Sequence, residues 1–192
     1  MTDGCLYAVT RDQMADEISY KYAFGTYEDA LKMVGVRTEP RVAGTVVSGA
    51  RIQHFAALVH DSNPAYWNLD FATRVWGGLV APPGLLMGWL IPQPWLPDGV
   101  RPTAGIAIRV PLPGKTFVNA SNEAEFLIPV VEGDRLSVVE EVVSVSPEKT
   151  TKLGVGHFIQ TLDTFLRHDG VVVALNRNTL FRFNPAEATD GL

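Results

Sequence analysis

The second half of the chain contains four long stretches rich in Val, Ile, Phe, Leu and Thr. Their composition restricts the possible folds more than any other feature of the sequence. The stretches cover residues 117–127, 135–146, 150–166 and 171–183. Turn-forming sequences separate them, and Asp169-Gly170 favours a tight hairpin because both residues tolerate positive φ. β-branched and aromatic residues between such turns predict an antiparallel meander of strands.

The N-terminal part is expected to be helical and to form an extension, residues 1–36, ahead of the main domain. Helical patterns cover residues 10–20 and 26–34, and Thr26-Tyr27-Glu28-Asp29 is close to a capping box. Residues 35–47 alternate small and β-branched side chains around Pro40 and Gly44, which predicts an irregular connector with a short strand.

Two more helices are expected in the middle of the chain. The first begins at Ser48, and its apolar residues recur at the spacing of one buried face: Ile52, Phe55, Ala56 and Val59. It ends before Pro64, which disfavours helix in the preceding residue. The second begins near Pro83 or Gly84 and continues to Leu90; it is apolar nearly all round, as in a helix enclosed by protein. A single apolar helix followed by long antiparallel strands predicts an α+β domain in which the sheet curls around a central helix.

Composition and charge narrow the class of protein. The 192 residues suit one domain with an added segment, and 46% apolar with 19% charged residues is typical of a globular protein. The net charge of −5 and the lack of a dense Lys/Arg cluster argue against a nucleic-acid partner. The start of the chain lacks a secretory signal and no apolar stretch is long enough for a membrane span, so we expect a cytoplasmic protein with no membrane partner.

One segment contains the candidate catalytic residues. It reads His60-Asp61-Ser62-Asn63-Pro64-Ala65-Tyr66, and Gly78-Leu79-Val80-Ala81-Pro82-Pro83-Gly84 follows it. This segment resembles the hydratase motif of the MaoC-like, hot-dog-fold enoyl-CoA hydratases and dehydratases. In that family an Asp, an Asn-Pro turn and a His five residues after the Asp line the reacting carbons. Tyr66 stands here at the position of that His.

The resemblance extends from about residue 37 to 185, and it implies a hot-dog domain over residues 37–192. The Asn-Pro-x-Tyr and Ala-Pro-Pro sequences look like the N-terminal or partner halves of two-part, fatty-acid-synthase-like dehydratases. In such a pair one half supplies Asp and His, and the other opens to hold a bulky acyl chain. The resemblance therefore implies an acyl-CoA or other acyl thioester as ligand and a catalytic MaoC-like partner, or a homodimer. We expect no cofactor and no metal, since no Cys/His spacing in the sequence resembles a zinc site.

Two interpretations of the candidate catalytic residues Asp61, His60 and Tyr66 are open. Addition of water to an unsaturated thioester needs a base, an acid and hydrogen-bond donors to the thioester oxygen. A phenol with a pKa of about 10 replaces imidazole poorly, so Tyr66 is expected to fill space and donate a hydrogen bond. Asp61 and Asn63 also suit local turn bonds, and His60 suits a helix C-terminus.

Substrate contacts are expected from residues around this segment. Gly84 is a candidate backbone donor to a thioester oxygen. The aromatic and sulfur-containing side chains of this region suit the wall of an acyl tunnel, although such residues are also typical of a core. They are Trp67, Trp76, Met87 and Trp89, and Asn63 completes the expected binding set.

Three functional hypotheses follow from the sequence. The first is an auxiliary, pocket-forming subunit of an enoyl-CoA hydratase or dehydratase whose partner supplies the Asp/His pair. The second is a self-sufficient homodimeric enzyme that uses Asp61 with His60 or Tyr66. The third is a non-catalytic acyl-thioester binding module.

Overall fold

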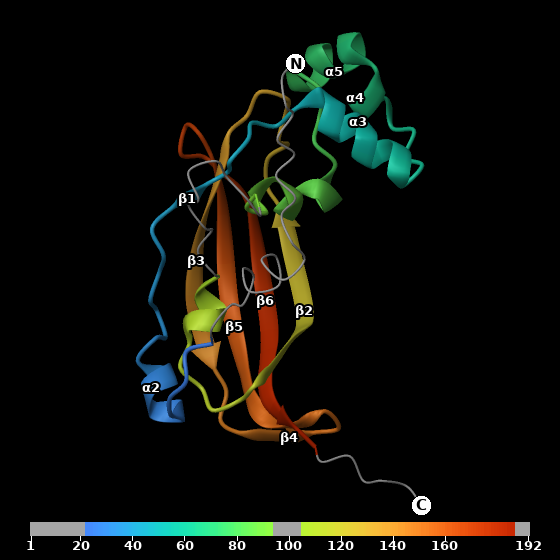
Figure 1. Cartoon of the computed structure of the whole chain (residues 1–192). Coiled ribbons are helices and arrows are strands. Elements are labelled where there is room, and N and C mark those ends of the chain that lie inside the picture. Colours follow the sequence, from blue (N-terminus) through green and yellow to red (C-terminus); the bar gives the residue numbers. More distant parts are fainter. Residues whose placement is uncertain (1–21, 94–104, 187–192) are drawn as a thin grey trace, which may run out of the picture.

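The computed structural model describes residues 22–93 and 105–186. It contains a six-stranded antiparallel sheet with short helices at its two ends (Figure 1). The α+β arrangement expected from the sequence is present as this sheet with its short helices. The expected helix over residues 10–20 lies outside the described residues, and the division at residue 36 stays a prediction.

The strands match the expected stretches, except that a turn divides the stretch over residues 150–166 into two strands. They are β1 (Arg41–Val42), β2 (Thr116–Phe126), β3 (Leu136–Val145), β4 (Lys149–Thr151), β5 (Gly154–Arg167) and β6 (Val172–Pro185). The order across the sheet is β1-β3-β5-β6-β2, with β4 paired to β5. Only β3, β5 and β6 form the expected meander, since β2 lies at the far edge, beside β6 instead of β3. The expected hairpin joins β5 to β6, with Gly170 at a φ of 82°.

The helical elements lie at opposite ends of the sheet (Figure 1). The helix α2 (Tyr27–Leu31) lies near the end that carries β4, and it begins with the expected capping box, in which Thr26 and Asp29 exchange hydrogen bonds. The helices α3 (Gly49–Leu58), α4 (Pro64–Trp67) and α5 (Leu69–Trp76) gather beyond the other end. We call this the helical end of the molecule.

The start of α3 is held by a distant side chain. Ser48 occupies the N-cap position but its side chain makes no cap hydrogen bond. Instead, the backbone N–H of Gly49 donates to Oε1 of Glu132 at 2.8 Å. Ile52 and Ala56 are buried as expected, whereas Val59 is exposed because the helix ends before it. The position of α3 therefore depends on the loop that precedes β3.

The expected apolar α-helix after Pro83 is replaced by two short 3-10 turns, η1 (Pro83–Leu85) and η2 (Met87–Leu90). Glycine costs about 1 kcal/mol in a helix and Pro82-Pro83 supplies no backbone donors, so this segment has weak support for a longer helix. Leu86 and Trp89 still pack into the core, and η2 contacts β3. A further turn, η3 (Ile106–Arg109), also lies against β3 and β5.

The buried apolar side chains form two clusters. The helical-end cluster is built around Ile52, Ala56, Leu86, Trp89, Phe165 and Val173. The far cluster is built around Ala30, Ile106, Val110, Leu112, Val142 and Ile159. Both include residues from the sheet, so the sheet presents one inner face to two separate cores.

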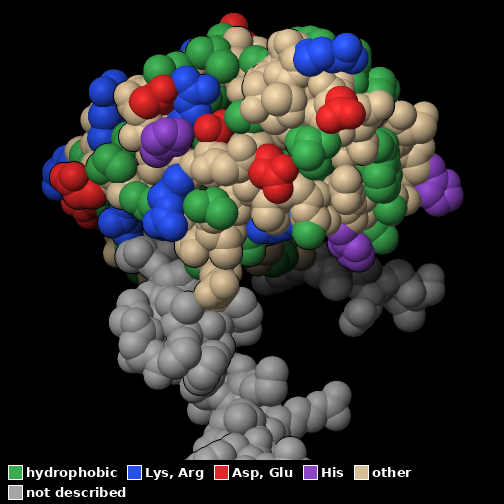
Figure 2. All heavy atoms as spheres, turned by 90° about the horizontal axis from the view of Figure 1, so that it is seen from above, with side chains coloured by type: hydrophobic (Ala, Val, Ile, Leu, Met, Phe, Trp, Pro, Cys, Tyr) green, Lys and Arg blue, Asp and Glu red, His purple; other side chains and the backbone are tan. Residues whose placement is uncertain are grey.

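The described residues at the helical end expose charges of both signs. Figure 2 shows Lys and Arg side chains interspersed with Asp and Glu on this face. Among the described residues, no helix is long and apolar enough to cross a bilayer. The expected cytoplasmic location stays a prediction.

Candidate functional site

A cavity of about 380 Å³ lies at the helical end between α4, α5, the segment after Leu79 and the sheet. We call it the first cavity. Its wall is almost entirely apolar, and Asn63 and Tyr66 provide its polar side chains. The other lining residues are Ala65, Phe71, Trp76, Val80, Ala81, Pro82, Pro83, Leu86, Val173, Ala174 and residues 126–130. Such a hollow suits an apolar chain or ring.

Local hydrogen bonds shape the loop that leads into the cavity. A carboxylate oxygen of Asp61 accepts the backbone N–H of Asn63 at 3.0 Å, and the side-chain oxygen of Asn63 accepts the N–H of Ala65 at 3.0 Å. Asn63 is thus the N-cap of α4, and Pro64 occupies its first turn. His60 turns the chain with a φ of 56°. The turn-forming roles expected for Asp61 and Asn63 are therefore present in the loop.

Tyr66 is buried in the wall of the first cavity, with 6% of its surface exposed. Burial raises the pKa of its phenol, and the charge of Asp61 raises it further, while the Asn63 side chain opposes the shift. The phenol therefore stays protonated at neutral pH. It can donate a hydrogen bond, but it is a weaker acid than an ordinary tyrosine.

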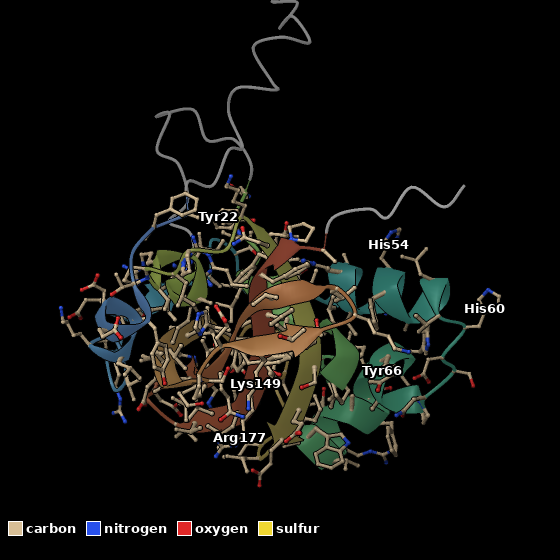
Figure 3. All side chains as sticks on the ribbon, turned by 90° about the horizontal axis from the view of Figure 1, so that it is seen from below. Tyr22, His54, His60, Tyr66, Lys149 and Arg177 are labelled. Atoms are coloured by element: carbon tan, nitrogen blue, oxygen red, sulfur yellow. The ribbon has the colours of Figure 1, made fainter. Side chains whose placement is uncertain are left out.

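His60, Asp61 and Trp67 lie on another side of α4, along an open groove of about 810 Å³. Figure 3 shows His60 projecting away from the fold, whereas Tyr66 lies within it. The indole N–H of Trp67 donates to the backbone oxygen of Asp61 at 2.8 Å, which fixes the ring over the loop. Residues that are consecutive in the motif thus face two different hollows.

The other expected binding residues are also dispersed. Trp76 lines the first cavity with Asn63, whereas Met87 lines a second cavity further along the sheet. Trp89 is buried in the helical-end cluster, and the guanidinium carbon of Arg51 lies 4.6 Å from its ring centroid. Gly84 is exposed at η1, near Phe55. Direct contact of these residues with a substrate stays a prediction.

Sequence reasoning missed the sheet side of the first cavity. Residues 126–130 and Val173 with Ala174 form that wall, and none of them belongs to the motif. They lie where β2 ends and β6 begins, next to the helical end. The sequence indicated that these residues lie at the ends of strands. It did not indicate that β2 lies beside β6, and that pairing brings the residues together.

Comparisons with known proteins identify the family. The family model for the FAS1-like, dehydratase domain region matches residues 32–176. A "Probable enoyl-CoA hydratase alpha subunit" of Thermomonospora curvata is 37% identical over 83% of this chain and 52% of its own length. A "3-oxo-4,17-pregnadiene-20-carboxyl-CoA hydratase alpha subunit" of Mycobacterium tuberculosis is 31% identical over 78% of this chain and 49% of its own length. The chain spans about half the length of these curated relatives.

Solved structures agree on the fold. One chain of the ChsH1-ChsH2 complex from Mycobacterium tuberculosis has a TM-score of 0.69 at 24% identity, covering 84% of this chain and 98% of that one. The R-hydratase PhaJ1 of Pseudomonas aeruginosa has a TM-score of 0.52 at 21% identity, covering 83% and 89%. The chain belongs to the MaoC-like hot-dog hydratase and dehydratase family, in its FAS1-like dehydratase branch.

Proposed function

We propose that this chain is the pocket-forming subunit of an enoyl-CoA hydratase or dehydratase that acts on a bulky acyl thioester, and that a MaoC-like partner supplies the Asp/His pair. One observation carries this proposal. The first cavity offers an apolar wall and a buried phenol, but no imidazole or carboxylate is among its described lining residues. The cavity is suited to hold an acyl group and poorly equipped to move protons at neutral pH.

The edge strand β2 supports a partner at this site. Among the described strands β2 pairs only with β6, and its residues from Asn119 onward are exposed. An unpaired edge of this length favours the addition of another chain. Phe126, Leu127 and Ile128 are partly exposed and also line the first cavity. A partner beside β2 would therefore stand at the wall of the acyl pocket.

The test compares the isolated chain with a reconstituted complex. Hydration of trans-2-dodecenoyl-CoA is measured for the chain alone, for a MaoC-like candidate partner alone and for their mixture. We expect the isolated chain to be slower than the mixture by at least about 100-fold, the size of a typical acid/base contribution. A chain that is fast alone and loses this activity as Asp61→Asn would support the homodimeric enzyme instead. Binding of acyl-CoA without turnover in any mixture would support the binding module.

A charge at the end of β2 tests where the partner docks. Leu127→Arg is expected to weaken the complex by at least about tenfold, because it places an unpaired charge against an apolar contact. Leu153→Arg is the matched control, since Leu153 is similarly exposed but lies in the turn between β4 and β5. Affinities measured by isothermal titration calorimetry decide the point, and equal affinities for both variants would exclude β2 as the docking edge.

A further inference from the structure

The amide of Asn63 in the wall of the first cavity has a fixed orientation. Its side-chain oxygen accepts the backbone N–H of Ala65 at 3.0 Å, which is the bond that caps α4. The nitrogen of an amide cannot accept, so this bond decides which end of the group faces the helix. The end that remains is the nitrogen, with two N–H groups. Asn63 therefore contributes hydrogen-bond donors to the first cavity.

Tyr66 offers a second donor in the same wall. Burial and the charge of Asp61 raise the pKa of its phenol, so the O–H keeps its proton at neutral pH. The Asn63 side chain lowers this pKa, because its amide is directed at the phenol oxygen. With the oxygen facing Asn63, the O–H of Tyr66 is the group that remains for a ligand. We call Asn63 and Tyr66 the donor pair.

The rest of the wall adds few acceptors and no charge. Trp76 has an indole N–H, which can only donate. None of the described lining residues is acidic or basic. Several backbone oxygens of the wall already accept a backbone N–H within the fold, namely those of Ala65, Pro82, Pro83, Val130 and Val173. A ligand in the first cavity therefore meets apolar surface and side-chain donors, without a counter-charge.

This combination favours one kind of ligand atom. A purely apolar ligand would leave the donor pair without a partner once water is displaced, and an unpaired buried donor is unfavourable. A carboxylate would accept both hydrogen bonds, but its charge would lie against apolar side chains with no cation beside it, which costs more. A neutral carbonyl oxygen accepts hydrogen bonds and brings no charge. It is therefore the group that the first cavity suits best.

We infer that the donor pair binds a neutral carbonyl oxygen of the ligand, and that Tyr66 and Asn63 are specificity-determining residues. Two parts of an acyl thioester present this acceptor: the thioester carbonyl itself and a keto group carried by the acyl chain. The assignment to an acyl thioester rests on the proposed function. The preference for a carbonyl rests only on the donor pair and on the uncharged wall of the first cavity.

A small ketone and its methylene analogue test the preference without a thioester. Binding of 2-adamantanone and 2-methyleneadamantane is measured by calorimetry, since the two cages have the same shape and only the ketone accepts a hydrogen bond. We expect the ketone to bind about tenfold more tightly, the effect of one buried hydrogen bond. The infrared carbonyl band of the bound ketone should also lie at lower frequency than in a hydrocarbon solvent. Equal affinities for the two probes would overturn the inference.

Two variants assign the preference to the donor pair. Tyr66→Phe removes only the hydroxyl, and it should abolish most of the tenfold preference and return the carbonyl band toward its hydrocarbon position. Asn63→Asp keeps an oxygen that caps α4 but replaces the amide N–H groups by an acceptor, so it should also reduce the preference. Tyr27→Phe, beside the far cluster, is the matched control and should change neither quantity. An unchanged preference in Tyr66→Phe refutes the inference, and Asn63→Asp decides if that variant does not fold.

Three coenzyme A derivatives distinguish the two sources of the carbonyl. Dodecanoyl-CoA carries the thioester oxygen, its thioether analogue dodecyl-CoA does not, and 11-oxododecanoyl-CoA adds a keto group. If the donor pair holds the thioester, Tyr66→Phe weakens binding of dodecanoyl-CoA by about tenfold and leaves dodecyl-CoA unchanged. If it holds a keto group, Tyr66→Phe weakens only 11-oxododecanoyl-CoA. Failure of all three to bind, with the preference for 2-adamantanone intact, would refute the proposed function and leave the carbonyl site standing.

Discussion

The two cavities lie against the same sheet, but their polar groups are assembled in different ways. In the first cavity Asn63 and Tyr66 come from one turn of chain and occupy neighbouring positions of a short motif. In the second, which Met87 also lines, Asp163 and Asn178 come from the paired strands β5 and β6. The first site is thus encoded locally and the second by the pairing of distant residues. Substitutions at three positions test the two sites independently.

The largest expected effect concerns Tyr66, which is both cavity wall and core. Tyr66→Ala should lower the free energy of unfolding by about 3–5 kcal/mol, because it removes a buried aromatic ring and leaves a void. Urea denaturation measures this loss. Tyr66→Phe keeps the ring and should retain most of the stability. A Tyr66→Ala protein as stable as the original would show that the first cavity is separate from the core.

Asp163 in the second cavity should make stability depend on pH. Burial raises its pKa to about 6, well above the ordinary value of an aspartate; nearby Glu140 also raises it, whereas Asn176 and Arg41 lower it. The folded protein therefore holds this proton more tightly than the unfolded chain, and stability is lost as the pH rises through about 6. Asp163→Asn removes that loss. The free energy of unfolding of the Asp163→Asn variant should exceed that of the unaltered protein by near zero at pH 4 and by on the order of 3 kcal/mol at pH 8.

Asp169 is the matched control for this pH dependence. Its pKa is lowered to about 2, chiefly by the hydrogen bonds from Arg167. A lowered pKa stabilises the folded protein above the ordinary value, so the sign is reversed. Asp169→Asn should therefore be less stable than the original at neutral pH, and the difference should vanish as the pH falls through about 2. Denaturation curves across the pH range distinguish the two carboxylates, and parallel behaviour would contradict the burial of Asp163.

The smallest effect comes from partly filling the first cavity. Val80→Trp adds an aromatic ring to its wall and should weaken dodecanoyl-CoA binding by about tenfold. Val155→Trp, at an exposed position on β5, is the control for the bulk of the side chain. Equal affinities for dodecanoyl-CoA in Val80→Trp and Val155→Trp would mean that the first cavity does not hold the acyl group.

The parts of the fold that depend on local chemistry were predictable. Thr26 and Asp29 encode their own helix cap, and Asp169-Gly170 encodes its own turn. The apolar run after Pro83 was wrongly expected to be one helix, because its hydrophobicity was weighed above the glycines and prolines that limit it to 3-10 turns. The position of β2 was also missed, since neighbouring strands in sequence need not be neighbours in a sheet.

The candidate site was only partly predictable for the same reason. Asn63 and Tyr66 of the motif line one cavity together with Trp76. Tyr66 and Trp67 are adjacent in sequence, yet successive residues of a helix point about 100° apart, so Trp67 faces the groove with Asp61. Asp163 and Asn176 had no local signal at all, because a polar residue in an alternating strand normally faces solvent. Strand register, which the sequence did not reveal, placed them inside.

The bond from Gly49 to Glu132 has a mechanical consequence. The loop that carries Glu132 also joins the first-cavity wall, since Ala81 donates its N–H to Val130 and Glu132 donates its own to Leu79, both at 2.8 Å. A side chain at position 49 would collide with the Glu132 carboxylate, so the two segments fit closely. A ligand that pushes this wall outward must pull α3 with it. Expansion of the pocket on this side would therefore move α3 together with the loop that carries Glu132.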